Sequence, residues 1–237
     1  MEFEQRYSRV ADIPDPLEIV LLMGRGCFWK QCTFCDYHLD RGPDSESIPL
    51  NHRVLDRVTG EFGRLTVLNS GSYFELPAET RDRIQHLVRE RAIRHLHIET
   101  HWRLAERTRT LKEALAVDGI ALHARIGIET FDEDFREDVM RKGMGKGVAV
   151  EAIADIYDEC CLLFGMAGQT PEQFEADLAI AKAHFHRVYV NLFNDNTTAV
   201  NADPALIRWF VDTWYPRLQA DDQVTALIEN TALGVGD

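Results

Sequence analysis

Short apolar runs alternate with longer amphipathic segments along most of the chain. The runs are rich in branched and aromatic residues and predict strands, whereas the segments between them repeat apolar positions every three or four residues and predict helices. The predicted strands are Glu18–Met23, Leu65–Asn69, His95–Glu99, Ala121–Glu129, Cys160–Phe164 and Arg187–Leu192. The predicted helices are Asn51–Val58, Ala78–Arg91, Leu104–Ala116, Gly147–Tyr157, Pro171–His184 and Pro204–Trp214. This order is typical of a parallel α/β sheet or barrel.

The number of strand–helix units limits the kind of barrel. A closed barrel of eight units typically needs about 250 residues, and this chain has 237 residues with six predicted units. We therefore predict an α/β fold, a partial (β/α)6 TIM-like barrel of parallel strands in a single domain. Residues 1–218 would form the barrel with its N-terminal extension. Residues 219–237 would form a C-terminal segment, which we expect to fold over the barrel mouth as a lid.

Polar side chains occupy alternate positions in three of the predicted strands. Because side chains alternate faces along a strand, Leu96 and Ile98 would face the helices and their polar neighbours would point inward. The inward set is His95, His97, Glu99, His123, Arg125, Glu129, Tyr189 and Asn191. A barrel filled only for stability carries branched aliphatic residues there, so the pattern predicts a cavity for a polar ligand. The alternative is a buried network in which these groups satisfy one another.

Charge and hydropathy narrow the range of partners. Asp and Glu number 39 against 26 Lys and Arg, which gives a formal net charge of -13. Binding to nucleic acid phosphates needs basic surface, so we expect a small-molecule substrate instead. No apolar stretch of about 18 residues predicts a membrane span, and the charged N-terminus lacks a signal-peptide core. We expect no membrane partner and a cytoplasmic location.

Three of the five cysteines follow the first predicted strand closely, in the segment GRGCFWKQCTFCDYH. In a cytosolic protein, such spacing of Cys27, Cys32 and Cys35 indicates metal ligation rather than disulfides. Three thiolates can ligate three irons of a cubane cluster and leave the fourth iron open to another ligand. A zinc site and three unrelated core cysteines are the alternatives. Cys160 and Cys161 would point to opposite faces of a strand, so we expect them to be core residues.

The cysteine segment resembles the cluster loop of the radical S-adenosylmethionine (SAM) superfamily. In that superfamily an aromatic residue precedes the third cysteine, as Phe34 does here, and the usual loop has three residues between the first two cysteines where this chain has four. Further segments at the ends of predicted strands resemble radical SAM enzymes related to archaeosine synthase and the Elongator catalytic subunit. These segments are LNSGSYFELP, HIET, IGIET and FGMAGQT. The resemblance covers most of the chain.

The resemblance implies that a [4Fe–4S] cluster on the three cysteines cleaves SAM reductively and that a 5′-deoxyadenosyl radical then abstracts hydrogen from a substrate. An external electron donor of the flavodoxin or ferredoxin type is implied as well. Arg141 or Lys142 would match a basic residue of the family. The implied SAM-contacting residues are Phe34, Asn69, Ser70, Gly71, Ser72, Glu99, Glu129 and Gly165.

The substrate is the least constrained part of this interpretation. The relatives modify tRNA, but the acidity of this chain and its lack of room for an RNA-binding domain favour a free polar heterocycle. We expect a lyase-type reaction on a 7-deazapurine base such as queuine, in queuosine salvage. Two alternatives remain: a tRNA-modifying radical SAM enzyme with an RNA-binding partner subunit, and a non-enzymatic iron–sulfur or zinc protein. Candidate substrate residues are His97, His123, Arg125, Tyr189, Asn191 and Asn194, and the loop at Asn194, Asp195 and Asn196 either caps a helix or binds substrate.

Overall fold

The computed structural model of the protein describes residues 3–228, and within them eight strands follow one another in chain order through a single sheet. β1 pairs antiparallel with β2, whereas the pairings from β2 to β4 and from β5 to β8 are parallel. The strands are β1 (Tyr7–Val10), β2 (Leu17–Leu22), β3 (Arg64–Asn69), β4 (His95–Glu99), β5 (Ala121–Glu129), β6 (Glu159–Phe164), β7 (Arg187–Leu192) and β8 (Val224–Leu227). This succession confirms the α/β, partial-barrel fold class, and adds β1 and β8 to the six predicted strands.

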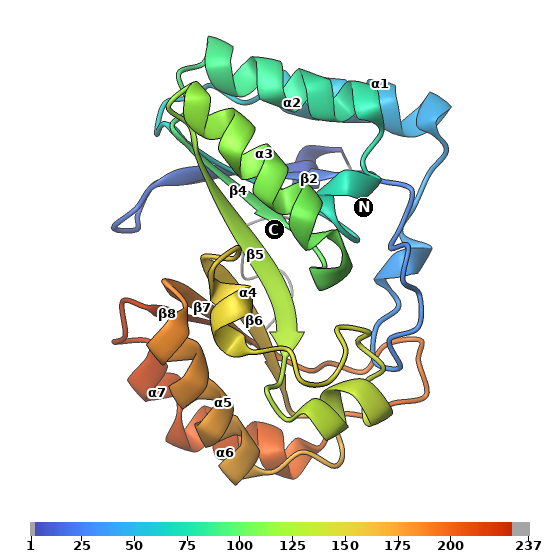
Figure 1. Ribbon diagram of the computed structural model, residues 1–237, viewed down its shortest axis with the longest axis vertical. Helices are drawn as coiled ribbons and strands as arrows, with labels where there is room; N and C mark the ends of the chain where they lie inside the picture. The colour runs from blue at the N-terminus through green and yellow to red at the C-terminus, as the bar shows by residue number, and fades with distance from the viewer. Residues whose placement is uncertain (1–2, 229–237) are drawn as a thin grey trace. The chain divides into compact units, whose positions relative to one another are not determined.

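Helices connect the parallel strands (Figure 1). They are α1 (Asp44–Leu55), α2 (Ala78–Glu90), α3 (Ala105–Val117), α4 (Val150–Ala154), α5 (Pro171–His184), α6 (Pro204–Thr213) and α7 (Tyr215–Leu218), with a π-helix at Phe135–Val139. Short 3-10 helices lie at Glu4–Arg6, Tyr37–Leu39, Tyr73–Glu75 and Trp102–Leu104. None of the helices in this described part is long and apolar enough to cross a membrane.

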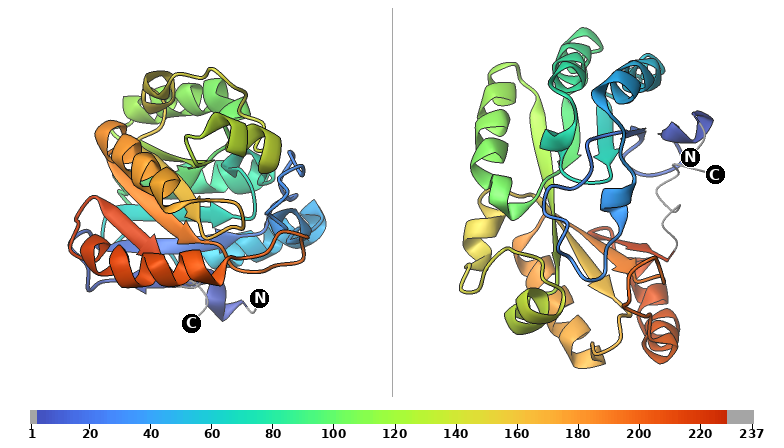
Figure 2. Two further views of the ribbon diagram at one scale, coloured as in Figure 1. Left: turned by 90° about the horizontal axis from the view of Figure 1, so that it is seen from below. Right: turned by 90° about the vertical axis from the view of Figure 1, so that its right-hand side faces the viewer.

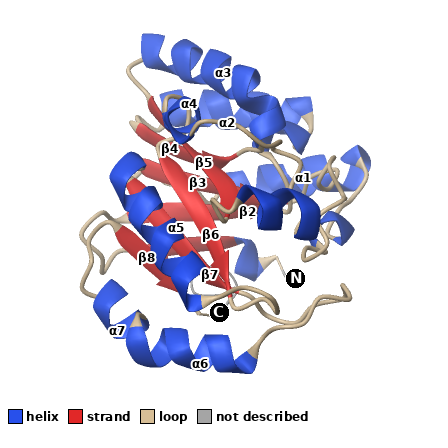
Figure 3. Cartoon of the chain, turned by 60° about the horizontal axis from the view of Figure 1, so that its bottom comes forward, coloured by secondary structure: helices blue, strands red, loops and turns tan. Residues whose placement is uncertain are grey.

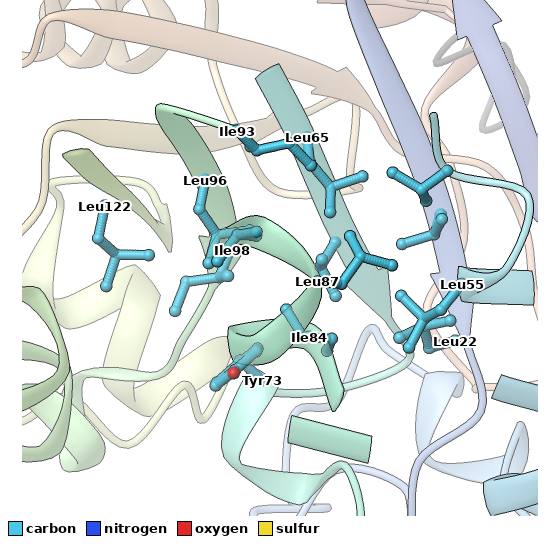
Figure 4. Close-up of a cluster of buried hydrophobic side chains, with 14 of the residues drawn as sticks. Leu22, Leu55, Leu65, Tyr73, Ile84, Leu87, Ile93, Leu96, Ile98 and Leu122 are labelled. Atoms are coloured by element: carbon cyan, nitrogen blue, oxygen red, sulfur yellow. The ribbon is translucent and has the colours of Figure 1, made fainter. Parts of the chain in front are cut away.

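The described chain divides into two compact units. The first contains residues 3–28 and 37–124, and the second contains residues 29–36 and 125–228. In the first unit, α1 and α2 run side by side, and the helices α1–α3 lie beside the strands (Figure 2). Figure 4 shows the core between them, where the strand residues Leu22, Leu65 and Leu96 pack against Ile84 and Leu87 of α2.

The core of the second unit is aromatic. Phe164 of β6 lies 4.9 Å from Phe174 of α5, and Phe174 lies 5.2 Å from Phe210 of α6, between ring centroids. Trp209 and Trp214, both half-buried, contact the same rings. Figure 3 shows α5, α6 and α7 beside the strands of this unit.

The burial pattern of the strands confirms the predicted alternation. Along β4, Leu96 and Ile98 are buried among the helices, whereas His95, His97 and Glu99 are half-buried. The alternate apolar positions of β5 and β7 are buried as well; among their polar residues, His123 and Asn191 are half-buried, whereas Arg125, Glu129 and Tyr189 are buried. In each strand the polar residues thus alternate with the apolar ones.

Beyond residue 218, the chain is only partly described. Val224–Leu227 form β8, which pairs in parallel with β7. Four residues of the segment expected to form a lid are thus a strand of the sheet. Residues 229–237, on which the remainder of the lid prediction rests, lie outside the described residues.

Candidate functional site

In the first unit, one acidic residue holds the backbone on both sides of Cys27. The carboxylate of Glu75 accepts hydrogen bonds from the backbone N–H of Phe28 and, at 2.5 Å, from that of Ser72. The backbone carbonyl of Glu75 accepts from the N–H of Arg25 at 3.1 Å. The loop leaving β2 is therefore fixed to the turn that follows β3, through groups that flank the first cysteine.

The turn after β3 lies directly against Cys27. A β-carbon at Gly71 would lie 2.4 Å from Oε2 of Glu75 and 3.2 Å from the Cα atom of Cys27, so the glycine lets the turn pack tightly against the first cysteine. Asn69 donates from Nδ2 to the carbonyl of Ser72 at 3.1 Å and closes the turn. Of the predicted SAM-contacting residues, Asn69, Ser70, Gly71 and Ser72 thus lie together in one turn beside the first cysteine.

In the second unit, the other two cysteines border an apolar cluster. Phe34 is buried with Phe135, Met140, Met166 and Phe193, and both Cys32 and Cys35 pack against this group. None of the five cysteines, all of which lie in the described residues, forms a disulfide.

A buried ion pair lies next to these two thiols. Lys142 donates from Nζ to Oε1 of Glu129 at 2.6 Å, and the same ammonium lies 5.8 Å from the centroid of the Phe34 ring. Burial alone would lower the pKa of Lys142, but the carboxylate of Glu129 and the thiols of Cys32 and Cys35 raise it, so Lys142 stays charged. Of the two basic residues that matched the family pattern, Lys142 is the one paired with the acid.

This donor set fits an iron–sulfur cluster. A cluster carried by three thiolates is anionic, and the fixed positive charge of Lys142 near Cys32 and Cys35 stabilises negative charge there. The apolar packing of Phe34 shields one side of the same loop from water. The surroundings of Cys32 and Cys35 in the second unit therefore suit two thiolate ligands of such a cluster.

Two further residues of the predicted SAM set end strands. Glu99 is the last residue of β4 and is half-buried in the first unit. Gly165 follows β6 with φ of +99°, and a β-carbon there would lie 2.9 Å from Cγ1 of Ile207, so α6 approaches too closely for any side chain. Gly165 also accepts a hydrogen bond from the N–H of Asp203 at 2.7 Å.

The histidines predicted to face inward form a stack in the first unit. The rings of His97 and His123 are stacked with centroids 4.5 Å apart, and Nδ1 of His95 lies 3.0 Å from Nε2 of His123. Nη1 of Arg64 lies 3.4 Å from Nε2 of His97. Burial, aided by the charges of Arg64 and His97, lowers the pKa of His95. These side chains therefore contact one another, as the buried-network interpretation describes.

A second polar group lies in the second unit, on β5, β6 and β7. Oε2 of Glu159 accepts from Nε and Nη2 of Arg125 at 3.0 and 2.9 Å, and both side chains are almost fully buried. The guanidinium carbon of Arg125 lies 3.5 Å from the centroid of the Tyr189 ring. Burial raises the pKa of Tyr189 to about 12. Asn191 is half-buried, two residues further along β7.

The polar loop after β7 contacts the cluster loop within the second unit. Asn196 donates from Nδ2 to the carbonyl of Phe34 at 2.7 Å, and Thr197 donates from its backbone N–H to Asp36 at 3.0 Å. Asp195 accepts from the N–H of Ala202 at 2.7 Å. Asp195 and Asn196 therefore have structural partners, and Asn194 donates from Nδ2 to the carbonyl of Leu192 at 3.4 Å.

The chain is similar to proteins of known structure. Queuine lyase from Clostridium spiroforme, solved with SAM and queuine bound, is 37% identical, with a TM-score of 0.91, and the match covers 98% of this chain and 99% of that chain. Streptococcus suis SuiB is 14% identical with a TM-score of 0.54, over 90% of this chain and 49% of that one, and shows the fold alone. No family model and no curated protein matches the chain.

The cluster loop, the strand-end residues and these matches define a radical SAM enzyme. Within that superfamily, the chain belongs to the family of queuine lyase. The radical SAM resemblance drawn from the cysteine loop is thereby confirmed.

Several residues around the site were not singled out from the sequence. Glu75 was visible only as the acid of the GSYFELP segment, and Glu159 lay outside the predicted strand Cys160–Phe164, because β6 begins one residue earlier. Trp29 carries no signal in its spacing, because its partners lie far along the chain. Interpreting the acid in GSYFELP as a hydrogen-bond acceptor for backbone N–H groups would have identified Glu75.

Proposed function

We propose that this enzyme acts on queuine, or on a closely related free 7-deazapurine base, by a lyase-type reaction that SAM cleavage starts. The observation that carries this proposal is the full-length likeness to queuine lyase, whose structure holds both SAM and queuine. The acidic balance of the chain, with a net charge of -13, supports a small substrate over tRNA.

Cys27, Cys32 and Cys35 would ligate a [4Fe–4S] cluster. When bound, the cluster supplies the electron that cleaves SAM into methionine and the 5′-deoxyadenosyl radical. The other residues bind and orient SAM: the turn Asn69–Ser72 beside Cys27 offers backbone groups, and Glu99 and Glu129 offer carboxylates for its ammonium or ribose hydroxyls. Lys142 holds Glu129 in place through their 2.6 Å contact.

The six candidate substrate residues divide by their position along the strands. Ligands of barrel enzymes bind at the carboxyl ends of the strands. Asn191 lies near that end of β7 and Asn194 follows it, so these two are the better candidates for direct contact with the base. The remaining four, His97, His123, Arg125 and Tyr189, lie in the first half or at the middle of their strands, contact other side chains there and would shape the interior.

The reaction also needs a low-potential electron source. We propose a one-electron donor of the flavodoxin or ferredoxin type, because the cluster must be reduced before SAM is cleaved. Dithionite can replace this donor in a first test.

The proposal can be tested by anaerobic reconstitution with iron and sulfide, followed by incubation with SAM, dithionite and queuine. We expect about four irons per chain, formation of 5′-deoxyadenosine and consumption of queuine, all followed by mass spectrometry. Cys32→Ala should abolish these signals, whereas Cys160→Ala, a matched control in a buried strand, should keep them. Turnover of tRNA with no response to queuine would favour the tRNA-modifying alternative. Tightly bound zinc without iron would refute the cluster.

A further inference from the structure

The extra residue between the first two cysteines coincides with a specific contact. Trp29, two residues after Cys27, donates from Nε1 of its indole to the backbone carbonyl of Arg141 at 2.7 Å. A β-carbon at Gly143 would lie 2.1 Å from Cζ2 of this indole and 2.4 Å from Cε2. The indole therefore fills the space that any side chain at position 143 would need.

The same segment of the cluster loop makes two more bonds to the same turn. The backbone N–H of Thr33 donates to the carbonyl of Met140 at 3.0 Å, and its hydroxyl donates to the carbonyl of Val139 at 2.8 Å. Together with the bond from Trp29, three consecutive carbonyls, 139 to 141, accept from the loop. These carbonyls belong to the last residue of the π-helix and the two residues after it. Carbonyls at a helix end lack donors within the helix, so the loop satisfies groups that would otherwise need water.

The turn that receives the loop also carries the buried cation. Lys142 lies between the last of these acceptors and Gly143, and it pairs with Glu129 at 2.6 Å. Gly143 has φ of +74°, a conformation that favours glycine for its own backbone as well as for the space it leaves to the indole. One short turn thus determines both where the Trp29 indole packs and where Lys142 lies.

We propose that Trp29 is a positioning residue for the cluster and that the four-residue spacing of the first two cysteines serves to place it. Packed against Gly143, the indole fixes the position of the loop of Cys32 and Cys35 relative to the turn that bears Lys142. This proposal rests on the proposed function, because it presupposes a cluster on the three cysteines.

The test uses the full chain, reconstituted anaerobically, as wild type, Trp29→Phe, Trp29→Ala, Gly143→Ala and the double variant Trp29→Ala/Gly143→Ala. Val139→Ala is the matched control, because Val139 is an exposed apolar residue of the same segment and offers only its backbone to the loop. The readout is the rate at which an iron chelator bleaches the visible absorbance of the cluster. Thermal unfolding of each metal-free chain reports whether the fold is intact.

We expect Trp29→Phe, which loses one hydrogen bond, to release iron about fivefold faster, because local opening becomes that much more frequent. Trp29→Ala should release it on the order of 30-fold faster, and Gly143→Ala about as fast, since a methyl group displaces the indole. In the Trp29→Ala background, Gly143→Ala should add less than about twofold. Val139→Ala should match the wild type, and Trp29→Phe should keep the unfolding midpoint.

Three results would overturn the proposal. The first is iron release from Trp29→Ala at the rate of the Val139→Ala control. The second is independent, multiplicative effects of the changes at positions 29 and 143, which would show that the two residues do not act through each other. The third is a wild type that reconstitutes no cluster, which would refute the proposed function itself and remove the premise for Trp29.

Discussion

Arg125 offers a test of how much the pairing of the inward polar residues with one another stabilises the fold. Its guanidinium contacts Glu159 at 2.9 and 3.0 Å and lies 3.5 Å from the centroid of the Tyr189 ring, with the side chains of Arg125 and Glu159 only 4% and 3% exposed. Arg125→Met leaves the carboxylate of Glu159 buried without its cation. Removing one partner of a buried pair costs about 3–5 kcal/mol of unfolding free energy, a large part of the roughly 5–15 kcal/mol that stabilises a typical domain.

The measurement is urea unfolding of the metal-free chain, followed by circular dichroism, with thermal unfolding as a second readout. For a chain of this size the expected loss corresponds to a fall of roughly 6–20 °C in the melting temperature. Arg125→Met/Glu159→Met should recover stability to within about 1–2 kcal/mol of the wild type, because no unpaired charge is then buried. If Arg125→Met is as stable as the wild type, or the double variant is less stable than the single one, the pair does not carry the energy assigned to it.

Three further predictions concern other parts of the chain. Glu129→Gln should weaken SAM binding by about tenfold or more in equilibrium titrations of the reconstituted enzyme, because the ion pair with Lys142 and its charge-assisted hydrogen bond are lost; an unchanged affinity would exclude Glu129 from the SAM site. Burial raises the pKa of Asp177 to about 6 from its usual 3.8, so the folded state binds this proton more tightly, and the unfolding free energy should fall as pH rises from about 4 to about 6. Asp177→Asn should flatten that slope in urea titrations at stepped pH, and an identical slope would contradict the assignment. Burial also raises the pKa of the Cys160 thiol, so Cys160→Ala/Cys161→Ala should keep the full iron content, and loss of iron would make these cysteines ligands.

Strands with a clear alternation of apolar and polar residues were predictable to the residue. The predicted bounds of β4, β5 and β7 agree with the structure, because one face of each is packed against helices and the other is polar. β1 and β8 were missed because each is only four residues long and alternation over so short a run is not distinctive. α1 begins at Asp44 rather than at the predicted Asn51. A proline normally lies in the first turn of a helix, so Pro49 favoured a late start, but in the structure it lies inside α1.

The residues of the site also differ in how far the sequence could predict them. The cysteines were identified because metal ligands are of few residue types and these three lie close together along the chain. The carboxylates at the strand ends were identified from the alternation within the strands. Contacts between distant segments, such as Trp29 with Gly143 or Asn196 with Phe34, leave no local pattern in one sequence. Glu159 belongs to the same class, because its importance lies in its partner Arg125 on another strand.

The bonds of Glu75 have a consequence for how sequences of this family can diverge. Its two carboxylate oxygens each accept from a backbone N–H, one after Cys27 and one in the turn after β3. Glutamine offers one oxygen and places an NH2 group against the second N–H, and aspartate is one methylene too short to reach both. No single substitution preserves both bonds, so we expect position 75 to remain glutamate in relatives that keep this loop, and its presence can mark such relatives where overall identity has become too low to detect them.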